Sequence, residues 1–355
     1  MLLLGSLQSV TFFNSYLQRS LGVPVGLINN AWGGSAAEAW VPREALEQTP
    51  RFMELVDYTR QREAYLSGPE ANADYTAALQ RWEDAGKKGR QPWSPEKWLN
   101  GNHRAGNLFA GMMSPIIGYG IKGAIWYQGE ANADRAAQYA DLFPFMISQW
   151  RDAWGQGDFP FYWVQLADFM AESPLPQESA WAELRDAQTQ TLALPRTGQA
   201  VIVDLGEGRD IHPRRKHDVG ARLARIALAQ DYGFDLGYLS PRYDHHEIDG
   251  AEVTVTFDCA GGALRPFDTR QLQGFAVCGE DRVWHWAEGE VVGKNQVVLH
   301  SDAVSRPVAV RYGWADNPVC NLYSEDGLPA IPFRTDDFPL GTADNETPVS
   351  DYGTP

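Results

Sequence analysis

Three short segments of this sequence each place chemically capable residues directly after an apolar run. These residues are Gly33 and Gly34, Gln128 and Glu130, and Asp210 and His212. Paired glycines let a backbone approach a ligand closely and aim its N–H groups at it. A side-chain amide can donate to a developing oxyanion, and an acid near a histidine can fix its tautomer and support an imidazolium. Together, an oxyanion site and a general base are groups that catalyse acyl transfer.

Each segment taken alone also has a purely structural interpretation. Paired glycines after a strand are typical of a tight turn. Gln128 could satisfy a neighbouring backbone group, and Glu130 and Asn132 could brace their loop. His212 precedes a proline and could be a loop histidine. The catalytic hypothesis therefore depends on three apolar runs ending in compatible residues.

The pattern of the first two-thirds of the chain predicts where these residues lie. Short apolar runs alternate there with helical spacing, as in a parallel sheet with crossover helices. The apolar runs are residues 23–29, 123–128, 159–166 and 199–205, and the helical patterns are 137–154, 180–194 and 215–230. Ligands of open α/β sheets bind beyond the carboxyl ends of the strands. We therefore expect the candidate residues to lie at that edge.

Two regions depart from this alternation. Residues 42–101 are rich in charge and tryptophan and too long for an ordinary connection, so we interpret them as an insertion near the rim of a site. Short alternating runs separated by turn residues predict a β-rich domain over residues 236–340. The predicted organisation is an α/β domain over 1–235, this β-rich domain, and a polar tail over 341–355.

The amino-acid composition argues against several classes of binding partner. The 355 residues include 30 Lys and Arg against 46 Asp and Glu, a formal net charge of −16. This balance argues against an electrostatic grip on nucleic acid or an anionic membrane. Three cysteines, and His245-His246 without suitable neighbours, predict neither a zinc site nor a cofactor. No apolar run approaches the ~20 residues of a membrane span, and we do not expect the opening residues to act as a signal peptide.

The motifs, in their order, resemble the sialate O-acetylesterases, a branch of the SGNH (GDSL-like) hydrolase superfamily. They are VPVGLIN (23–29), WGGS (32–35), EAW (38–40), IWYQGEANA (125–133), WAELRDAQ (181–188), VDLGEGRDIHPRRK (203–216), VGARLA (219–224), GFAVCGED (274–281) and VRYGWADNPVCNLYSEDGLPAIPFRTD (310–336). The resemblance runs from about residue 9 to 338. It implies a flavodoxin-like three-layer α/β/α domain and a carbohydrate O-acetylesterase of the sialate 9-O-acetyl type that uses a Ser-His-Asp mechanism. By resemblance, no cofactor is expected, and the partner is an acetylated sugar or glycan.

The resemblance also implies roles for the oxyanion residues. Gly33 and Gly34 correspond to the glycine block of the superfamily. Gln128 corresponds to the side-chain oxyanion donor, in the place where other SGNH enzymes use Asn. Glu130 follows in the same motif and is assigned with it to oxyanion and substrate binding.

The general base implied by the resemblance is His212, with Asp210 as its orienting acid. The superfamily's usual spacing is Asp-x-x-His, but the residue three before His212 is an arginine. Asp204 or Glu207 could therefore hold the imidazole instead.

The nucleophile block of the family has no evident counterpart in this sequence. The family places its serine in a Gly-Gln-Ser-Asn or Gly-Asp-Ser turn upstream of the segment matching residues 9–21. Gly5-Ser6 is not followed by Asn, and we expect no strand before it. Ser35 is interpreted as a turn or capping residue because Gly-x-Ser-x-Gly is not completed. We therefore expect the serine to lie upstream, the central first strand of the sheet to be missing, and this chain as given to have little or no esterase activity.

Two other functions fit the same sequence: an inactive protein that binds glycans in the same cleft, and an acetylxylan-type esterase. The 13 tryptophans and 14 tyrosines suit sugar stacking but equally suit core packing. Arg185 and Arg104 are candidates for binding a sugar carboxylate, or for structural pairing. Relatives often carry export signals, so the resemblance points to the periplasm or the cell exterior, while the chain itself leaves the compartment open.

Overall fold

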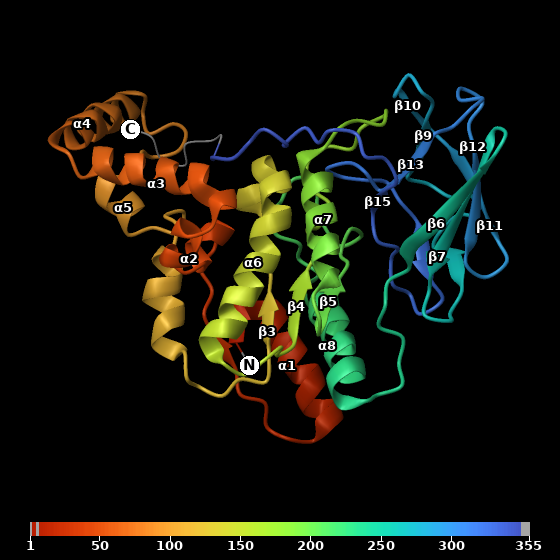
Figure 1. The fold of residues 1–355 in the computed structure, drawn as a ribbon, viewed down its shortest axis with the longest axis horizontal. Coiled ribbons are helices and arrows are strands. Elements are labelled where there is room, and N and C mark those ends of the chain that lie inside the picture. Colours follow the sequence, from red (N-terminus) through yellow and green to blue (C-terminus); the bar gives the residue numbers. More distant parts are fainter. Residues whose placement is uncertain (1, 5–6, 349–355) are drawn as a thin grey trace. The chain divides into compact units, whose positions relative to one another are not determined.

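The computed structural model describes residues 2–4 and 7–348, with side chains described from residue 8 onward (Figure 1). Its contacts divide the chain into two compact units, each described here by itself. The first unit contains the residues up to 31, 121–127 and 159–341, and the second contains 32–120, 128–158 and the residues from 342. The predicted domain limits at residues 235 and 340 come from the sequence pattern and not from contacts, and they stay a prediction.

A five-stranded parallel sheet forms the centre of the first unit. Its strands are β1 (Leu2–Leu4), β2 (Ile28–Asn29), β3 (Ala124–Trp126), β4 (Phe161–Val164) and β5 (Thr197–Ala200). The order β2-β1-β3-β4-β5 is that of a flavodoxin-like sheet. Every residue of β3, β4 and β5 is buried. Strands β3 and β4 lie within the predicted runs 123–128 and 159–166. Strand β5 overlaps the run 199–205 only at its last two residues, and β2 covers only the last two residues of the run 23–29.

The expectation that the central first strand is missing is wrong. Residues 2–4 form that strand, and it pairs in parallel with β2 through Leu2↔Ile28 and with β3 through Leu2↔Ala124. Three residues suffice because a strand between two neighbours satisfies its backbone groups on both sides. A run of three residues shows no periodicity in the sequence, so it was not recognised as a strand. Gly5 and Ser6, which follow it, lie outside the described residues.

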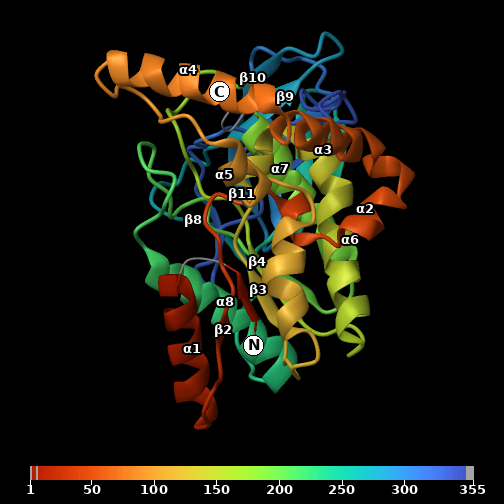
Figure 2. The ribbon, with the colours of Figure 1, turned by 90° about the vertical axis from the view of Figure 1, so that its left-hand side faces the viewer.

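Helices α1 (Leu7–Leu21) and α8 (Lys216–Tyr232) lie side by side, as Figure 2 shows. Val10, Phe13 and Leu17 of α1 lie on one stripe and join a core cluster that includes residues of α8, β3, β4 and β5. Gly220 allows this close approach, since a Cβ there would lie 2.6 Å from that of Phe12. The sheet and its helices confirm the predicted α/β architecture.

The β-rich region predicted for the C-terminal part is also confirmed, and it is teal to blue in Figure 1. Its strands are β6 (Arg242–Asp249), β7 (Glu252–Asp258), β8 (Leu264–Pro266), β9 (Phe275–Cys278), β10 (Trp284–Trp286), β11 (Glu288–Val292), β12 (Gln296–His300), β13 (Ala309–Tyr312), β14 (Leu322–Ser324) and β15 (Phe333–Arg334). They pair antiparallel in sheets of order β10-β9-β13-β15, β11-β12-β7-β6 and β14-β8. A shared apolar core that includes Val255, Val277, Leu299 and Tyr312 holds them together.

Arg185 of α7 (Ala180–Gln190) attaches this region to the α/β part of the first unit. The fully buried guanidinium donates to four backbone carbonyls, those of Leu166, Ala167, Ala315 and Asp316, at 2.7–2.9 Å. Burial lowers the pKa of Arg185 to about 10. The sequence allowed two roles for Arg185, binding of a sugar carboxylate or structural pairing. The role is structural, because its N–H groups donate to backbone carbonyls of the protein.

The second unit is helical. It contains α2 (Arg43–Glu47), α3 (Met53–Leu66), α4 (Pro69–Asp84), α5 (Pro95–Leu99), α6 (Ala136–Trp154) and the short helices η1 (Ala37–Trp40), η2 (Pro50–Phe52), η3 (Phe109–Met113), η4 (Ser114–Ile116) and η5 (Glu130–Arg135). Within the segment interpreted as an insertion, Leu66, Ala71 and Trp98 form a small core of their own. Among the residues that the structure describes, no helix is both long and apolar enough to cross a membrane.

Candidate functional site

The glycine pair forms an exposed turn in the second unit. Gly34 has a φ of +66°, a conformation that favours glycine over other residues. Asn102 holds the turn from both sides: its Nδ2 donates to the Gly33 carbonyl at 2.8 Å, and its own carbonyl accepts from the Ala36 N–H at 3.1 Å. The turn is thus fixed by a residue distant in sequence, while its glycines stay open to solvent.

Ser35, directly after the turn, is held in the interior. Its side chain is buried, and its Oγ accepts a hydrogen bond from the Trp40 indole N–H at 2.9 Å. Its carbonyl accepts from Nε2 of Gln128, also at 2.9 Å. These contacts agree with the interpretation of Ser35 as a turn residue, because its hydroxyl is engaged and shielded.

Gln128 lies buried at the centre of a polar network in the second unit. Its Nε2 donates to the Ser35 carbonyl and, at 2.7 Å, to Oδ1 of Asn132. Its Oε1 accepts from the Tyr139 hydroxyl at 3.2 Å. Rotating the amide by half a turn would set its oxygen against two other oxygens, so the network fixes its orientation. Both amide hydrogens have acceptors here, and donation to an oxyanion requires one of them to change partner.

A buried ion pair anchors this network. Glu38 Oε2 accepts from Nδ2 of Asn132 at 2.9 Å, and Glu38 Oε1 lies 2.7 Å from Nη2 of Arg135. Asn132 Oδ1 also accepts from the Ala37 N–H at 2.9 Å. Sequence analysis gave Glu38 and Arg135 no role. Glu130, predicted for substrate binding, is half-buried at the start of η5.

His103 is a further neighbour of the glycine turn that sequence analysis missed. Its ring is hydrogen-bonded to the backbone of Gly34, and burial is the main cause that lowers its pKa, with the Glu38 carboxylate opposing this effect. The edge of Trp93 packs against it, with 5.9 Å between ring centroids. No local pattern could have revealed this histidine, because 69 residues separate it from Gly34.

His212 and Asp210 lie together in a loop of the first unit. Asp210 Oδ1 accepts from the His212 backbone N–H at 2.9 Å and lies 3.4 Å from Nδ1 of the ring. The backbone hydrogen bond from His212 is the main cause that lowers the pKa of the Asp210 carboxyl. The histidine side chain is 81% exposed. The loop therefore presents an ionised acid beside an accessible imidazole.

The two alternative acids have other partners. Asp204 receives both terminal nitrogens of Arg222, at 2.6 and 2.7 Å, and the Tyr323 hydroxyl at 3.1 Å. Glu207 lies 3.4 Å from Nε of Arg214. Of the three acids considered from the sequence, Asp210 is the one whose carboxylate contacts His212.

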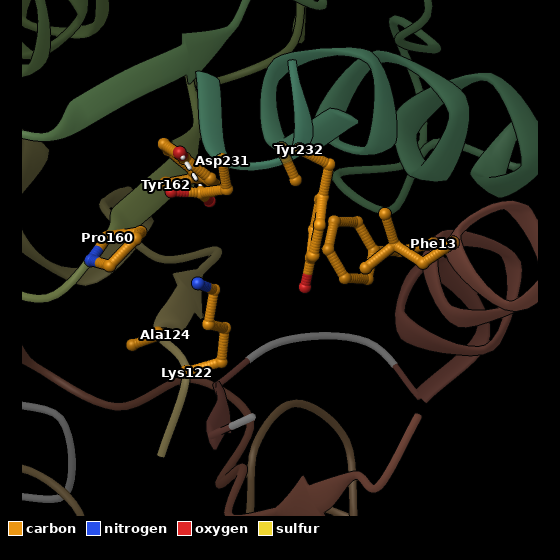
Figure 3. Close-up of a pocket in the computed structure, with 10 residues that line it drawn as sticks. Phe13, Lys122, Ala124, Pro160, Tyr162, Asp231 and Tyr232 are labelled. Atoms are coloured by element: carbon orange, nitrogen blue, oxygen red, sulfur yellow. Dashed lines mark hydrogen bonds between the residues drawn. The ribbon is translucent and has the colours of Figure 1, made fainter. Parts of the chain in front are cut away.

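A hollow at the opposite end of the sheet is shown in Figure 3. It is lined by Lys122, Ala124 and Pro160 at the amino ends of β3 and β4, and by the hydrogen-bonded pair Tyr162 and Asp231, 2.8 Å apart. Ligands of parallel sheets bind at the carboxyl ends, so this hollow is not the candidate active site. Within the described ranges, no three His, Cys, Asp or Glu side chains gather as metal ligands.

Comparison with known proteins supplies relatives for most of the chain. Residues 75–229 match the family of carbohydrate esterases described as sialic acid-specific acetylesterase. The chain is 29% identical to sialate O-acetylesterase of Mus musculus over 353 residues, and 26% identical to that of Homo sapiens over 348. Each match covers 90% of this chain, but only 62% of the mouse protein and 59% of the human one.

A solved structure resembles the chain more closely. It is the crystal structure of a novel carbohydrate acetylesterase from Xanthomonas citri, with 38% identity and a TM-score of 0.75. The match covers 93% of this chain and 65% of that one. The chain thus spans about three-fifths of the curated relatives it matches. These findings agree with the resemblance that the motifs carry: the chain is similar to the sialate O-acetylesterases, and its residues 75–229 match the model of that carbohydrate esterase family.

Proposed function

We propose that this chain carries the general base and the oxyanion-binding residues of a carbohydrate O-acetylesterase. The observation that carries the proposal is the pair of Asp210 and His212, with Oδ1 and Nδ1 3.4 Å apart, inside the segment that matches the esterase family. Gln128 lies in the same segment. The substrate of this proposal is an acetyl ester on a sugar, of the 9-O-acetyl sialate type.

In the proposed reaction, a serine hydroxyl attacks the acetyl carbonyl carbon. His212 takes the hydroxyl proton at Nε2, while Asp210 at Nδ1 keeps the ring in the correct tautomer and stabilises the imidazolium. The imidazolium then gives the proton to the leaving sugar oxygen. Water, deprotonated by the same histidine, hydrolyses the acetyl-enzyme and releases acetate.

The negative charge that develops on the carbonyl oxygen requires hydrogen-bond donors. The proposal assigns this task to backbone N–H groups of the turn at Gly33 and Gly34, together with the Gln128 amide. The turn suits the task because its glycines are exposed and its shape is fixed by Asn102. Gln128 would contribute by transferring one N–H from Ser35 or Asn132 to the oxyanion.

The identity of the nucleophile stays a prediction, namely a serine upstream of this chain. Ser35 is disfavoured because its hydroxyl is buried against Trp40. Ser6 follows β1 and precedes α1, and it lies outside the described residues. One reason for rejecting Ser6 was the absence of a preceding strand, and that reason no longer holds.

Acetate release tests the proposal. The chain, and any longer form of it encoded in the same reading frame, are assayed with 9-O-acetylated sialic acid, acetylated xylo-oligosaccharides and p-nitrophenyl acetate. We expect His212→Asn to abolish hydrolysis and Ser35→Ala to retain it. His245→Asn is the matched control, because His245 is also exposed and lies 3.0 Å from the carboxylate of Asp244.

The outcomes separate the alternatives. Loss of turnover in Ser6→Ala places the nucleophile in this chain, whereas activity found only in the longer form places it upstream. Saturable sugar binding without acetate release from either form identifies the inactive glycan-binding protein. Hydrolysis that survives His212→Asn refutes the assigned base.

A further inference from the structure

The sheet of order β10-β9-β13-β15 has two faces of different character. Phe275 and Val277 of β9 and Val310 and Tyr312 of β13 point into the apolar core of the β-rich region. The alternate residues of the same strands therefore lie on the other face. This second face carries an unusual set of side chains.

Ala276 lies at the middle of that face, between two large neighbours. It is opposite Trp286 on β10 and opposite Arg311 on β13. Trp284, two residues before Trp286, shares the face. Because the alanine side chain is small, a shallow hollow open to solvent remains between these side chains, and Trp314 also lines it.

The walls of this hollow are rigid. Nε and Nη2 of Arg311 bind the two carboxylate oxygens of Asp336 at 2.9 and 3.0 Å, and Nη1 binds Glu178 at 2.8 Å. The guanidinium lies 4.2 Å from the ring centroid of Trp284 and 5.0 Å from that of Trp314. The indoles are thus held in place before any ligand binds, which lowers the entropic cost of binding.

Packing within the chain does not account for two features of the indoles. Trp286 is 42% exposed even though its indole N–H donates to the Pro174 carbonyl at 2.9 Å. Trp314 is 6% exposed, and its indole Nε1 has no hydrogen-bond partner among the described residues. Unpaired buried donors are rare and costly. The exposed ring of Trp286 beside this hollow is a surface on which a ligand with apolar C–H groups can stack.

The charge at the hollow selects among such ligands. The guanidinium groups of Arg311 and Arg334 are balanced by the carboxylates of Asp336 and Glu178, since Arg334 Nη2 also binds Asp336 at 2.8 Å. The cluster therefore has no net charge and offers no unpaired cation to an anionic group. A neutral ligand fits this balance better than a charged one.

We propose that this hollow binds a neutral pyranose ring of a glycan. The apolar C–H face of the sugar stacks on the exposed indole of Trp286 against Trp284. The site belongs to the β-rich region and uses none of the residues assigned to ester hydrolysis. It would hold an unacetylated sugar as well as an acetylated one.

Saturation-transfer NMR on the intact chain tests this site. The probes are lactose, xylotetraose and cellotetraose, with N-acetylneuraminic acid as the charged comparison. We expect at least one neutral probe to bind saturably, with the strongest transfer to the protons of one ring face. Trp286→Ala removes the stacking surface, and Ala276→Leu fills the hollow while leaving every tryptophan in place. Each should weaken binding at least tenfold.

Trp82→Ala is the matched control, since Trp82 is a half-buried tryptophan on α4. It should bind the probe as the parent chain does, and thermal unfolding shows that each variant is folded. Binding that survives both Trp286→Ala and Ala276→Leu overturns the proposal. So does the failure of all three neutral probes to bind, or tighter binding of N-acetylneuraminic acid than of any neutral probe. If Trp286→Ala does not fold, Ala276→Leu decides alone.

Discussion

Glu38 and Arg135 form an ion pair in the interior of the second unit, with 2.7 Å between Oε1 and Nη2 and side chains that are 1% and 0% exposed. The second oxygen of Glu38 accepts from Asn132, which in turn accepts from Gln128. A fixed charge pair at one end of this network therefore sets the orientation of the candidate oxyanion amide at the other end. Positioning of this kind is what a preorganised oxyanion site needs.

Removing the charge of Glu38 should destabilise the fold strongly. Glu38→Gln removes the carboxylate 2.7 Å from Nη2 of the buried Arg135 and leaves the more distant carboxylate of Asp134, 3.8 Å from Nε. We expect the free energy of unfolding to fall by ~3–5 kcal/mol. Urea denaturation measures this value. Asp57→Asn is the control, because Asp57 pairs with Arg60 at the surface, where such pairs contribute less than ~1 kcal/mol. Equal losses in the two variants would contradict the buried role of Glu38.

Gln128→Ala separates the catalytic role of the amide from its structural one. If the amide donates to the oxyanion, kcat for p-nitrophenyl acetate should fall by ~10²–10³ with little change in KM. Tyr139→Phe removes the hydroxyl that donates to Oε1 and should leave kcat within about tenfold of the parent. The measurement is made in whichever form hydrolyses the ester. A kcat that hardly changes in Gln128→Ala, with a lower unfolding temperature, would make Gln128 a structural residue.

Asp210 and Asp204 should differ in what their substitution changes. Asp210→Asn removes the carboxylate beside Nδ1 of His212, and we expect kcat to fall by ~10²–10⁴ with little loss of stability. Asp204→Asn weakens the bidentate pair with Arg222 and should cost about 3 kcal/mol of stability, with kcat retained below the unfolding temperature. Parallel kinetics and urea denaturation of both variants test this, and the reverse pattern would make Asp204 the orienting acid.

The sequence was sufficient for the architecture because the elements are encoded locally. Strands β3 and β4 lie within the apolar runs 123–128 and 159–166, whereas β5, with the sequence TGQA, precedes most of the predicted run 199–205. The central strand β1 was missed because three residues carry no period. The pairing that makes β1 a strand comes from β2 and β3, which are distant in sequence.

The candidate site was predictable only in part. The residues themselves stand out in the sequence, but their partners do not. The contact of Asp204 with Arg222, 18 residues further on, is not visible in the sequence. Glu38 and Arg135 are 97 residues apart, so no motif joins them.

Arg185 had a local signal that was available. It lies one helical turn after Trp181 and three residues before Gln188, and all three side chains are buried on one stripe of α7. An arginine on a buried stripe is more consistent with pairing inside the protein than with binding of a ligand. Helical spacing, weighed together with charge, would have favoured the structural interpretation from the outset.

Arg185→Met should destabilise the first unit. The substitution leaves four carbonyl groups without their donor, and each unsatisfied buried group costs ~1–3 kcal/mol before any relaxation. We expect the free energy of unfolding to fall by at least ~3 kcal/mol. Arg242→Met is the control, since Arg242 and its partner Asp258 are both about half exposed. A loss no larger than that of the control would show that water replaces the guanidinium.

His103 should make stability depend on pH in the mildly acidic range. Burial lowers the pKa of its ring in the folded protein below the ~6.5 of an unperturbed histidine. The unfolded chain therefore takes up this proton first, and the unfolding free energy falls as the pH decreases below about 6.5. The loss stops once the pH is below the pKa of His103 in the folded protein, where the ring is protonated in both states.

In His103→Gln this contribution disappears, so the variant should lose less stability than the parent between pH 7 and pH 5. Urea denaturation at intervals across that range measures the difference, and contributions from other groups, such as the buried carboxyl of Asp168, whose pKa is raised by burial, cancel in it. Parallel curves for the two proteins would mean that the ring of His103 meets water in the folded state and does not stand buried against Gly34.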